Sequence, residues 1–267
     1  RLIMIKTNRE EYDVVISLGG NCNVSSQLKH RGLRVCSFPF DWTLMPDSKP
    51  VKYLPHGIRT RFSDFAQREN MQVFEPPAYE YGNIRQRLED SVSGFRFIHQ
   101  FSSSPEDKSC FSAERKIIQR RIDRFYRKVA ECRNVLFVLG TGFSFDSKLL
   151  EDIYIALQET FSGVCIEIVS IQFSSATTKT FDLMNGKIHI EQCERKCNIV
   201  YDNQFTAPEW CWMDQINLTG RLPLKEVRKR NFLIKLKYKL WMWLGRSLEN
   251  AGAGCANMRF YKFERYA

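Results

Sequence analysis

Apolar runs and amphipathic segments alternate along the chain as far as residue 171. Continuous apolar runs are typical of strands buried on both faces, and apolar residues at helical spacing indicate amphipathic helices. The predicted strands are 13–20, 134–140 and 164–171, and the predicted helices are 23–30, 112–132 and 149–161. Because a strand, a helix and a second buried strand form a βαβ unit, the pattern predicts an α/β fold with a mainly parallel central sheet and flanking helices.

Three stretches give a weaker pattern. Residues 34–40 and 95–99 resemble short strands, the first interrupted by Pro39. Residues 46–94 contain five prolines and mix polar with apolar positions, so we expect loops with short helices there.

The amino-acid composition becomes strongly basic after residue 224. Residues 225–246 hold eight basic residues against one acidic residue, so this segment carries +7 of the net charge of +10. On a helix over 225–248, one side is apolar and the opposite side is basic. The sequence therefore predicts an α/β catalytic domain over 1–224 and a basic amphipathic helix with a tail over 225–267. That helix either lies on an anionic membrane surface or packs on the same domain.

The composition indicates the class of protein and its cellular compartment. Hydrophobic residues make up 43% of the 267, which is enough for a large core. The nine cysteines are an odd number spread along the chain, which is typical of reduced thiols rather than a disulfide framework. Neither a secretory signal nor a membrane-spanning segment is visible, so we expect a cytoplasmic protein, peripheral at the inner membrane if the basic helix binds there. Because the basic charge is local, we expect no nucleic-acid partner.

Cys22 lies where the first predicted strand turns into a helix. The positive end of a helix dipole favours thiolate, the reactive form of cysteine. Gly19 and Gly20 allow close backbone approach to a substrate, and the N–H groups around Asn21 are candidates to bind an oxyanion. The alternative is a buried structural cysteine beside a glycine turn that holds phosphate.

His99 follows an apolar strand and precedes a polar loop, where it would serve as a base toward a thiol. The alternative is a histidine with a purely structural role. Asp41, between aromatic residues, would orient a histidine, bind a substrate hydroxyl or cap the turn after Pro39. Gln100 and Trp42, next to His99 and Asp41, are candidate substrate contacts.

Five segments together carry a resemblance to a known family. They are 18–22, 38–42, 97–101, 120–125 and 135–138. In order and spacing, the chain over 13–140 resembles a bacterial family of papain-like cysteine peptidases. The resemblance implies that Cys22 is the nucleophile and His99 its partner. Related capsular-polysaccharide acetyltransferases pair a cysteine with coenzyme A, which implies acyl-CoA as donor.

Two positions depart from the family pattern. Gln100 stands where an Asp is expected after the histidine, and Gly20 stands where a Ser is expected before Asn-Cys. The third catalytic residue is therefore open among Asp41, Asp146 and Asp214.

Other polar groups give weaker signals. His189, Cys193 and Cys197 are spaced by four, as zinc ligands on one helix would be, but no fourth ligand is evident and the surrounding sequence alternates like a strand. We therefore expect no metal. Residues 120, 121 and 124 are arginines that form a solvated helix face or, less simply, bind a phosphate of coenzyme A.

Three functions follow from these residues. The first is a cysteine-dependent acyl-transfer enzyme that modifies a bacterial surface glycan or its precursor, with a glycan or another small molecule as acceptor. The second is a papain-like peptidase that uses the same Cys22–His99 pair. The third is a non-catalytic α/β module that binds a phosphate or a nucleotide-sugar.

Overall fold

The computed structural model describes residues 7–8, 11–80, 83–174, 179–194 and 208–219. The predicted basic helix over 225–248 and the tail that follows it lie outside these residues, as does Cys197. Among the described residues, no helix is both long and apolar enough to cross a membrane.

A five-stranded sheet forms the centre of the described fold. In spatial order its strands are β2 (Val14–Gly19), β7 (Asn134–Thr141), β8 (Cys165–Ser174), β10 (Ile188–Glu194) and β9 (Lys179–Leu183). The first four are parallel to one another, and β9 is antiparallel to β10. Helix α4 (Lys148–Thr160) connects β7 to β8. The prediction of a mainly parallel sheet is therefore confirmed.

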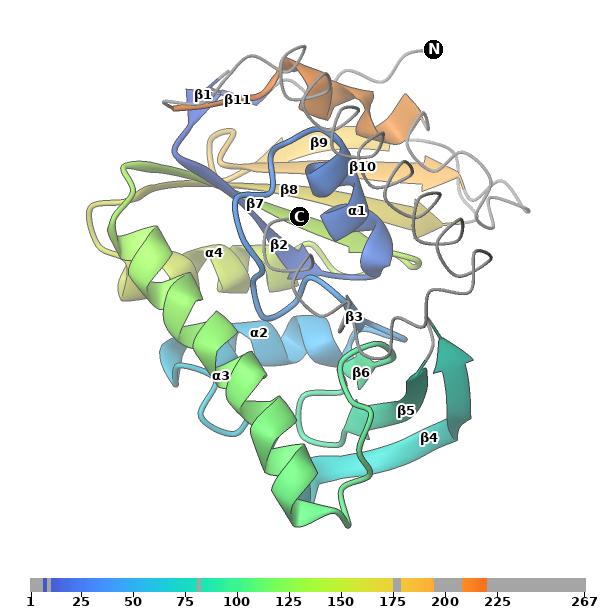
Figure 1. Cartoon of the computed structure of the whole chain (residues 1–267). Helices are drawn as coiled ribbons and strands as arrows, with labels where there is room; N and C mark the ends of the chain where they lie inside the picture. Colours follow the sequence, from blue (N-terminus) through green and yellow to red (C-terminus); the bar gives the residue numbers. More distant parts are fainter. Residues whose placement is uncertain (1–6, 9–10, 81–82, 175–178, 195–207, 220–267) are drawn as a thin grey trace, which may run out of the picture. The chain divides into compact units, whose positions relative to one another are not determined.

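Helices cover both faces of this sheet (Figure 1). Successive side chains of a strand point to opposite faces, and β2 divides its residues accordingly. Val15 packs with Val24 and Leu28 of α1 (Cys22–His30), whereas Val14 and Ile16 belong to the cluster formed with the other helices. Those helices are α2 (Lys49–Arg59), α3 (Lys108–Ala130) and α4. Burial on both faces explains the continuous apolar runs.

A second, antiparallel sheet lies between α1 and α3 in the sequence. Its strands, in spatial order, are β3 (Thr43–Leu44), β6 (Arg96–Phe97), β5 (Asn83–Asp90) and β4 (Met71–Glu80). The expectation of loops with short helices over 46–94 is wrong, because this region contains α2 and the long β4–β5 hairpin. Pro76 and Pro77 are tolerated because β4 is an edge strand and its register with β5 shifts between Glu75 and Ala78, so neither proline occupies a paired position.

The remaining elements are short. They are β1 (Glu11–Tyr12), β11 (Asn217–Leu218), and the 3₁₀ helices η1 (Arg68–Asn70) and η2 (Pro208–Gln215). Residues 34–40, expected as a strand, form a loop instead. Phe38 and Phe40 are fully buried and anchor this loop in the aromatic core, where Phe40 stacks on Phe95 with ring centroids 5.3 Å apart.

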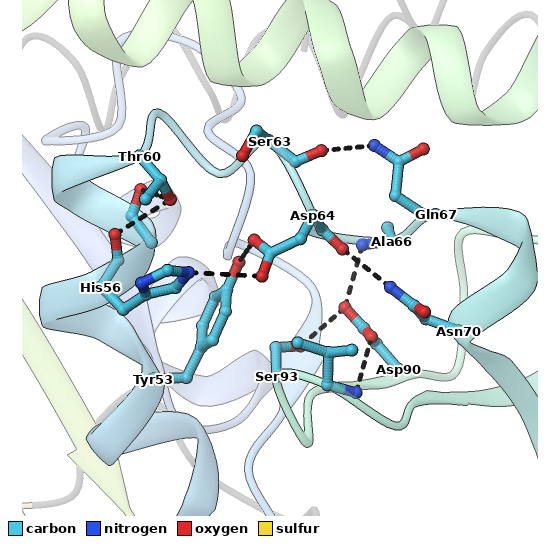
Figure 2. Close-up of polar contacts among 12 residues, drawn as sticks. Tyr53, His56, Thr60, Ser63, Asp64, Ala66, Gln67, Asn70, Asp90 and Ser93 are labelled. Atoms are coloured by element: carbon cyan, nitrogen blue, oxygen red, sulfur yellow. Dashed lines mark hydrogen bonds and ion pairs between the residues drawn. The ribbon is translucent and has the colours of Figure 1, made fainter.

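A polar cluster joins α2 to the chain that follows it (Figure 2). The hydroxyl of Tyr53 donates to Asp64 at 2.6 Å, and Nε2 of His56 lies 3.4 Å from the same carboxylate. Nearby, the buried carboxylate of Asp90 accepts from the backbone N–H of Ala66 at 2.9 Å and the hydroxyl of Ser93 at 2.8 Å. Ala66 has a φ of 53°, in the left-handed region that non-glycine residues rarely adopt, so Asp90 stabilises an unfavourable turn.

Candidate active site

Cys22 is the first residue of α1, directly after the turn that ends β2. Asn21 is the N-cap, and its side-chain oxygen accepts from the backbone N–H of Asn23 at 2.9 Å. The thiol is half-buried. The side chain of Asn21 is thus used to begin the helix that presents Cys22.

The two glycines before the cap serve backbone geometry. Gly19 and Gly20 have φ values of +101° and +120°, which L side chains rarely adopt. A Cβ on Gly20 would lie 1.4 Å from the carbonyl oxygen of Gly140, at the end of the neighbouring strand β7. The glycine turn therefore lets the start of α1 approach the carboxyl end of the parallel sheet, where α/β proteins commonly bind ligands.

His99 follows β6 in the second sheet, and a carboxylate holds its ring. Nδ1 of His99 lies 2.7 Å from Oε2 of Glu80, the last residue of β4. The other oxygen of Glu80 accepts from Arg87 of β5, whose Nη1 donates to the carbonyl of Ile98 at 3.0 Å. A hydrogen-bonded chain thus runs from Arg87 through Glu80 to His99.

The charges of this chain act on both Glu80 and the thiol. Burial favours a higher pKa for Glu80, but hydrogen bonds from His99 and Arg87 outweigh it and hold the pKa below its usual value. Glu80 is therefore ionised at neutral pH, and it is the acceptor that fixes a proton on Nδ1 of His99.

Burial raises the pKa of Cys22, and the negative charge of Glu80 raises this pKa further. The backbone N–H of Cys22 and the positive charge of Arg87 lower the pKa, but the net shift is upward. Glu80 and Arg87 are the charged side chains that act on this thiol. Burial therefore opposes the thiolate that the helix terminus favours.

The aspartates considered from the sequence have other partners. Asp41 is buried, and its Oδ2 accepts from Nε of Arg34 at 2.8 Å and from the backbone N–H of Phe38 at 3.0 Å. Asp146 accepts from the backbone N–H of Lys148 at the start of α4. Asp214 forms an ion pair with Arg31 at 3.1 Å. The carboxylate on His99 is instead Glu80, which the sequence analysis missed.

Gln100 and Trp42 occupy different settings. Both polar atoms of the Gln100 side chain are buried and have no hydrogen-bond partner among the described residues. The ring of Trp42 lies under the guanidinium of Arg34, 5.2 Å from its centroid. An unpaired buried amide is costly, so Gln100 is the better placed of the two to bind a ligand.

The spacing that suggested zinc does not fall on a helix. His189 and Cys193 lie on β10, and Nδ1 of His189 is 2.8 Å from Asp182. Within the described part of the chain, no group of three or more His, Cys, Asp or Glu side chains is arranged to hold a metal ion.

Comparison with known families matches residues 13–176 to the family described as "Putative papain-like cysteine peptidase (DUF1796)". The chain belongs to this family. The matched region contains Cys22, Glu80 and His99, and it includes the whole second sheet. No curated protein and no solved structure matches the chain. The family description indicates a cysteine-dependent enzyme and leaves the acyl acceptor open.

Proposed function

We propose that this papain-like family member is a cysteine-dependent acyl-transfer enzyme in which Cys22 is the nucleophile and His99 its base. The contact between Glu80 and His99, together with the action of the Glu80 charge on the Cys22 thiol at a helix N-terminus, is the observation that carries the proposal. A carboxylate–histidine–thiol arrangement is the one that nucleophilic catalysis requires.

The protonation states define the chemistry. Cys22 is a neutral thiol at rest, since its pKa is raised, so its proton must leave as the sulfur attacks. Ionised Glu80 holds the proton of His99 on Nδ1, which leaves Nε2 to accept the thiol proton. The Sγ–carbonyl carbon bond forms, the carbonyl π electrons move to oxygen, and Nε2 becomes protonated.

Collapse of the tetrahedral intermediate completes the transfer to the enzyme. The carbonyl re-forms, the bond to the leaving group breaks, and His99 gives its new proton to that group. Nε2 is then free to take a proton from the acceptor, whose oxygen attacks the thioester carbon. The bond from that carbon to Sγ breaks, and Nε2 returns its proton to Cys22, which regenerates the thiol. The amide nitrogen of Gln100, a buried donor without a partner among the described residues, is a candidate to bind the oxyanion, as are the backbone N–H groups around Asn21.

We also propose substrates for the reaction. The donor is a thioester such as acyl-CoA and the acceptor is a hydroxyl of a bacterial glycan or its precursor, in the cytoplasm. The resemblance to capsular-polysaccharide acetyltransferases supports this choice. The family description supports the alternative, a peptidase in which an amide is the donor and water the acceptor.

Mass spectrometry of the intact protein separates these functions. We expect incubation with acetyl-CoA to add one acetyl group, located on Cys22 by peptide mapping, and Cys22→Ser to abolish it. Cys110→Ser is the matched control, because Cys110 is exposed on α3. Cleavage of a peptide library without acylation by acetyl-CoA would establish the peptidase. The absence of both reactions would contradict a catalytic role for Cys22.

Membrane contact through 225–248 is a separate proposal, supported by the basic amphipathic sequence. Flotation with anionic vesicles at low salt tests it. We expect Lys235→Glu with Lys239→Glu to reduce co-flotation, and no co-flotation of the unaltered protein would reject the anchor.

A further inference from the structure

A second group of charged side chains lies between α3 and the loop over 34–41. Nε of Arg34 donates to Oδ2 of Asp41 at 2.8 Å, and its Nη2 donates to the hydroxyl of Ser37 at 2.8 Å. Nη1 of Arg124 donates to the backbone carbonyl of Ser37, also at 2.8 Å. Two arginines from distant parts of the sequence therefore converge on one residue of this loop.

Arg121 joins the group from the preceding turn of α3. Residues three apart on a helix are neighbours, so Arg121 and Arg124 share one side of α3. Nη1 of Arg121 is buried and has no hydrogen-bond partner among the described residues. Asp41 is the acidic group whose charge acts on Arg121, and it opposes the effect of burial, which lowers the pKa of the arginine.

Asp41 carries a buried acceptor without a partner, as Arg121 carries a buried donor. Its Oδ2 is bound by Arg34, but its Oδ1 is buried without a partner in the described part of the chain. The group thus combines three guanidinium ions with one carboxylate and leaves one buried donor and one buried acceptor unmet. Buried polar groups are normally paired, and an uncompensated buried charge is strongly unfavourable.

We infer that Arg34, Arg121 and Arg124 form a binding site for a protonated phosphate group. Phosphate oxygens accept from the guanidinium of Arg121, and the phosphate O–H donates to Oδ1 of Asp41. Arginine is suited to phosphate because its planar fork matches two oxygens at once. An anion that carries a proton satisfies both unmet atoms, whereas a fully ionised anion meets the arginine but repels the carboxylate.

This site is distinct from the proposed catalytic one. Arg124, Asp41, Arg34 and Lys128 are the charged groups that act on Cys36, while Glu80 and Arg87 act on Cys22. The inference therefore stands whether or not Cys22 is a nucleophile.

Calorimetric titration with inorganic phosphate and with sulfate, at matched ionic strength, tests the inference. At about pH 6 phosphate carries a proton and sulfate does not. We expect phosphate to bind and sulfate to bind about tenfold more weakly, the equivalent of one charge-assisted hydrogen bond. Arg121→Gln should weaken phosphate binding by about tenfold or more. Arg120→Gln, exposed on the same helix, should leave it unchanged.

Equal binding of phosphate and sulfate, unaltered by Arg121→Gln, would overturn the inference, as would the absence of phosphate binding. If Arg121→Gln does not fold, Arg124→Gln gives the same readout. Competition with coenzyme A then distinguishes two sources of the phosphate group. Displacement of bound phosphate supports a phosphorylated cofactor, and retention supports free phosphate as the ligand of the site.

Discussion

Two histidines of this protein contact carboxylates in different surroundings. His189 on β10 is 3% exposed, with Nδ1 2.8 Å from Asp182 and Nε2 3.6 Å from the buried Glu167. The side chain of His99 is 32% exposed, and its Nδ1 lies 2.7 Å from Glu80. No hydrogen bond or ion pair to Nε2 of His99 is formed among the described residues. One ring is enclosed by acids on both sides, and the other is held from one side only.

The difference teaches what a histidine needs in order to act as a base. Burial lowers the pKa of His189, but the hydrogen bond to Asp182 and the nearby carboxylate of Glu167 outweigh it and raise the pKa above its usual value. Glu167 also accepts from the hydroxyl of Tyr12 at 2.9 Å and from the backbone N–H of Asn8 at 3.1 Å. His189 is therefore a structural cation. His99 keeps Nε2 without a hydrogen bond among the described residues.

Replacement of His99 should give the largest effect on activity. His99→Ala removes the group that accepts the thiol proton, so we expect acylation of Cys22 to slow by about 10²- to 10⁴-fold. The melting temperature should change little, because the side chain is partly exposed. Stopped-flow acylation and thermal unfolding measure the two effects. Unchanged acylation in a folded His99→Ala protein would reject His99 as the base.

His189→Ala should show the opposite behaviour. Loss of the cation leaves Glu167 buried without its counter-charge, and we expect the free energy of unfolding to fall by about 3 kcal/mol. The estimate is at the low end for a broken buried pair because Tyr12 and Asn8 still bind the carboxylate. Chemical denaturation measures this loss. Acylation by the protein that remains folded should keep its rate, and a stable but inactive variant would mean that the two histidines have been assigned the wrong roles.

Glu80→Gln tests how His99 is positioned. A charge-assisted hydrogen bond contributes about 1.5–3 kcal/mol, so we expect acylation to slow by about 10- to 100-fold. Glu89→Gln, a partly exposed position in the same sheet that binds Arg96, is the matched control. An unchanged acylation rate in a folded Glu80→Gln protein would mean that Glu80 does not position His99.

The sequence predicts the parallel sheet well because burial on both faces leaves continuous apolar runs in β7 and β8. It fails over 46–94 for a physical reason. The prolines that favour loops sit at tolerated positions, with Pro50 in the first turn of α2 and Pro76 and Pro77 on an edge strand. Pro55 lies inside α2, where packing in the core overrides local preference.

Half of the candidate site follows from local sequence. Cys22 is recognisable because a strand, a glycine turn and a helix are adjacent in the chain. Glu80 is not, since it meets His99 only through the pairing of β4, β5 and β6, and nothing near Glu80 marks it as different from other surface acids. Had the β4–β5 hairpin been predicted, the opposite charges of Glu80 before its turn and Arg87 after it would have suggested a pair.

The pH dependence of stability should give the smallest effect and separate the two histidines most cleanly. The pKa of Glu167 lies below its usual value of 4.5, so its contribution is present above that value and is lost as the pH falls through the lowered pKa. The pKa of His189 lies above its usual value of 6.5, so its contribution is complete below 6.5 and is lost as the pH rises through the raised pKa. The His189 cluster therefore stabilises the fold most between these two values.

Above pH 6.5 we expect the free energy of unfolding to decline by at most about 1.4 kcal/mol per pH unit. Urea unfolding across this range should show the decline in the unaltered protein and in His99→Ala, and its loss in His189→Ala. Parallel curves for all three proteins would mean that His189 is not the structural cation, and the contrast with His99 would fail.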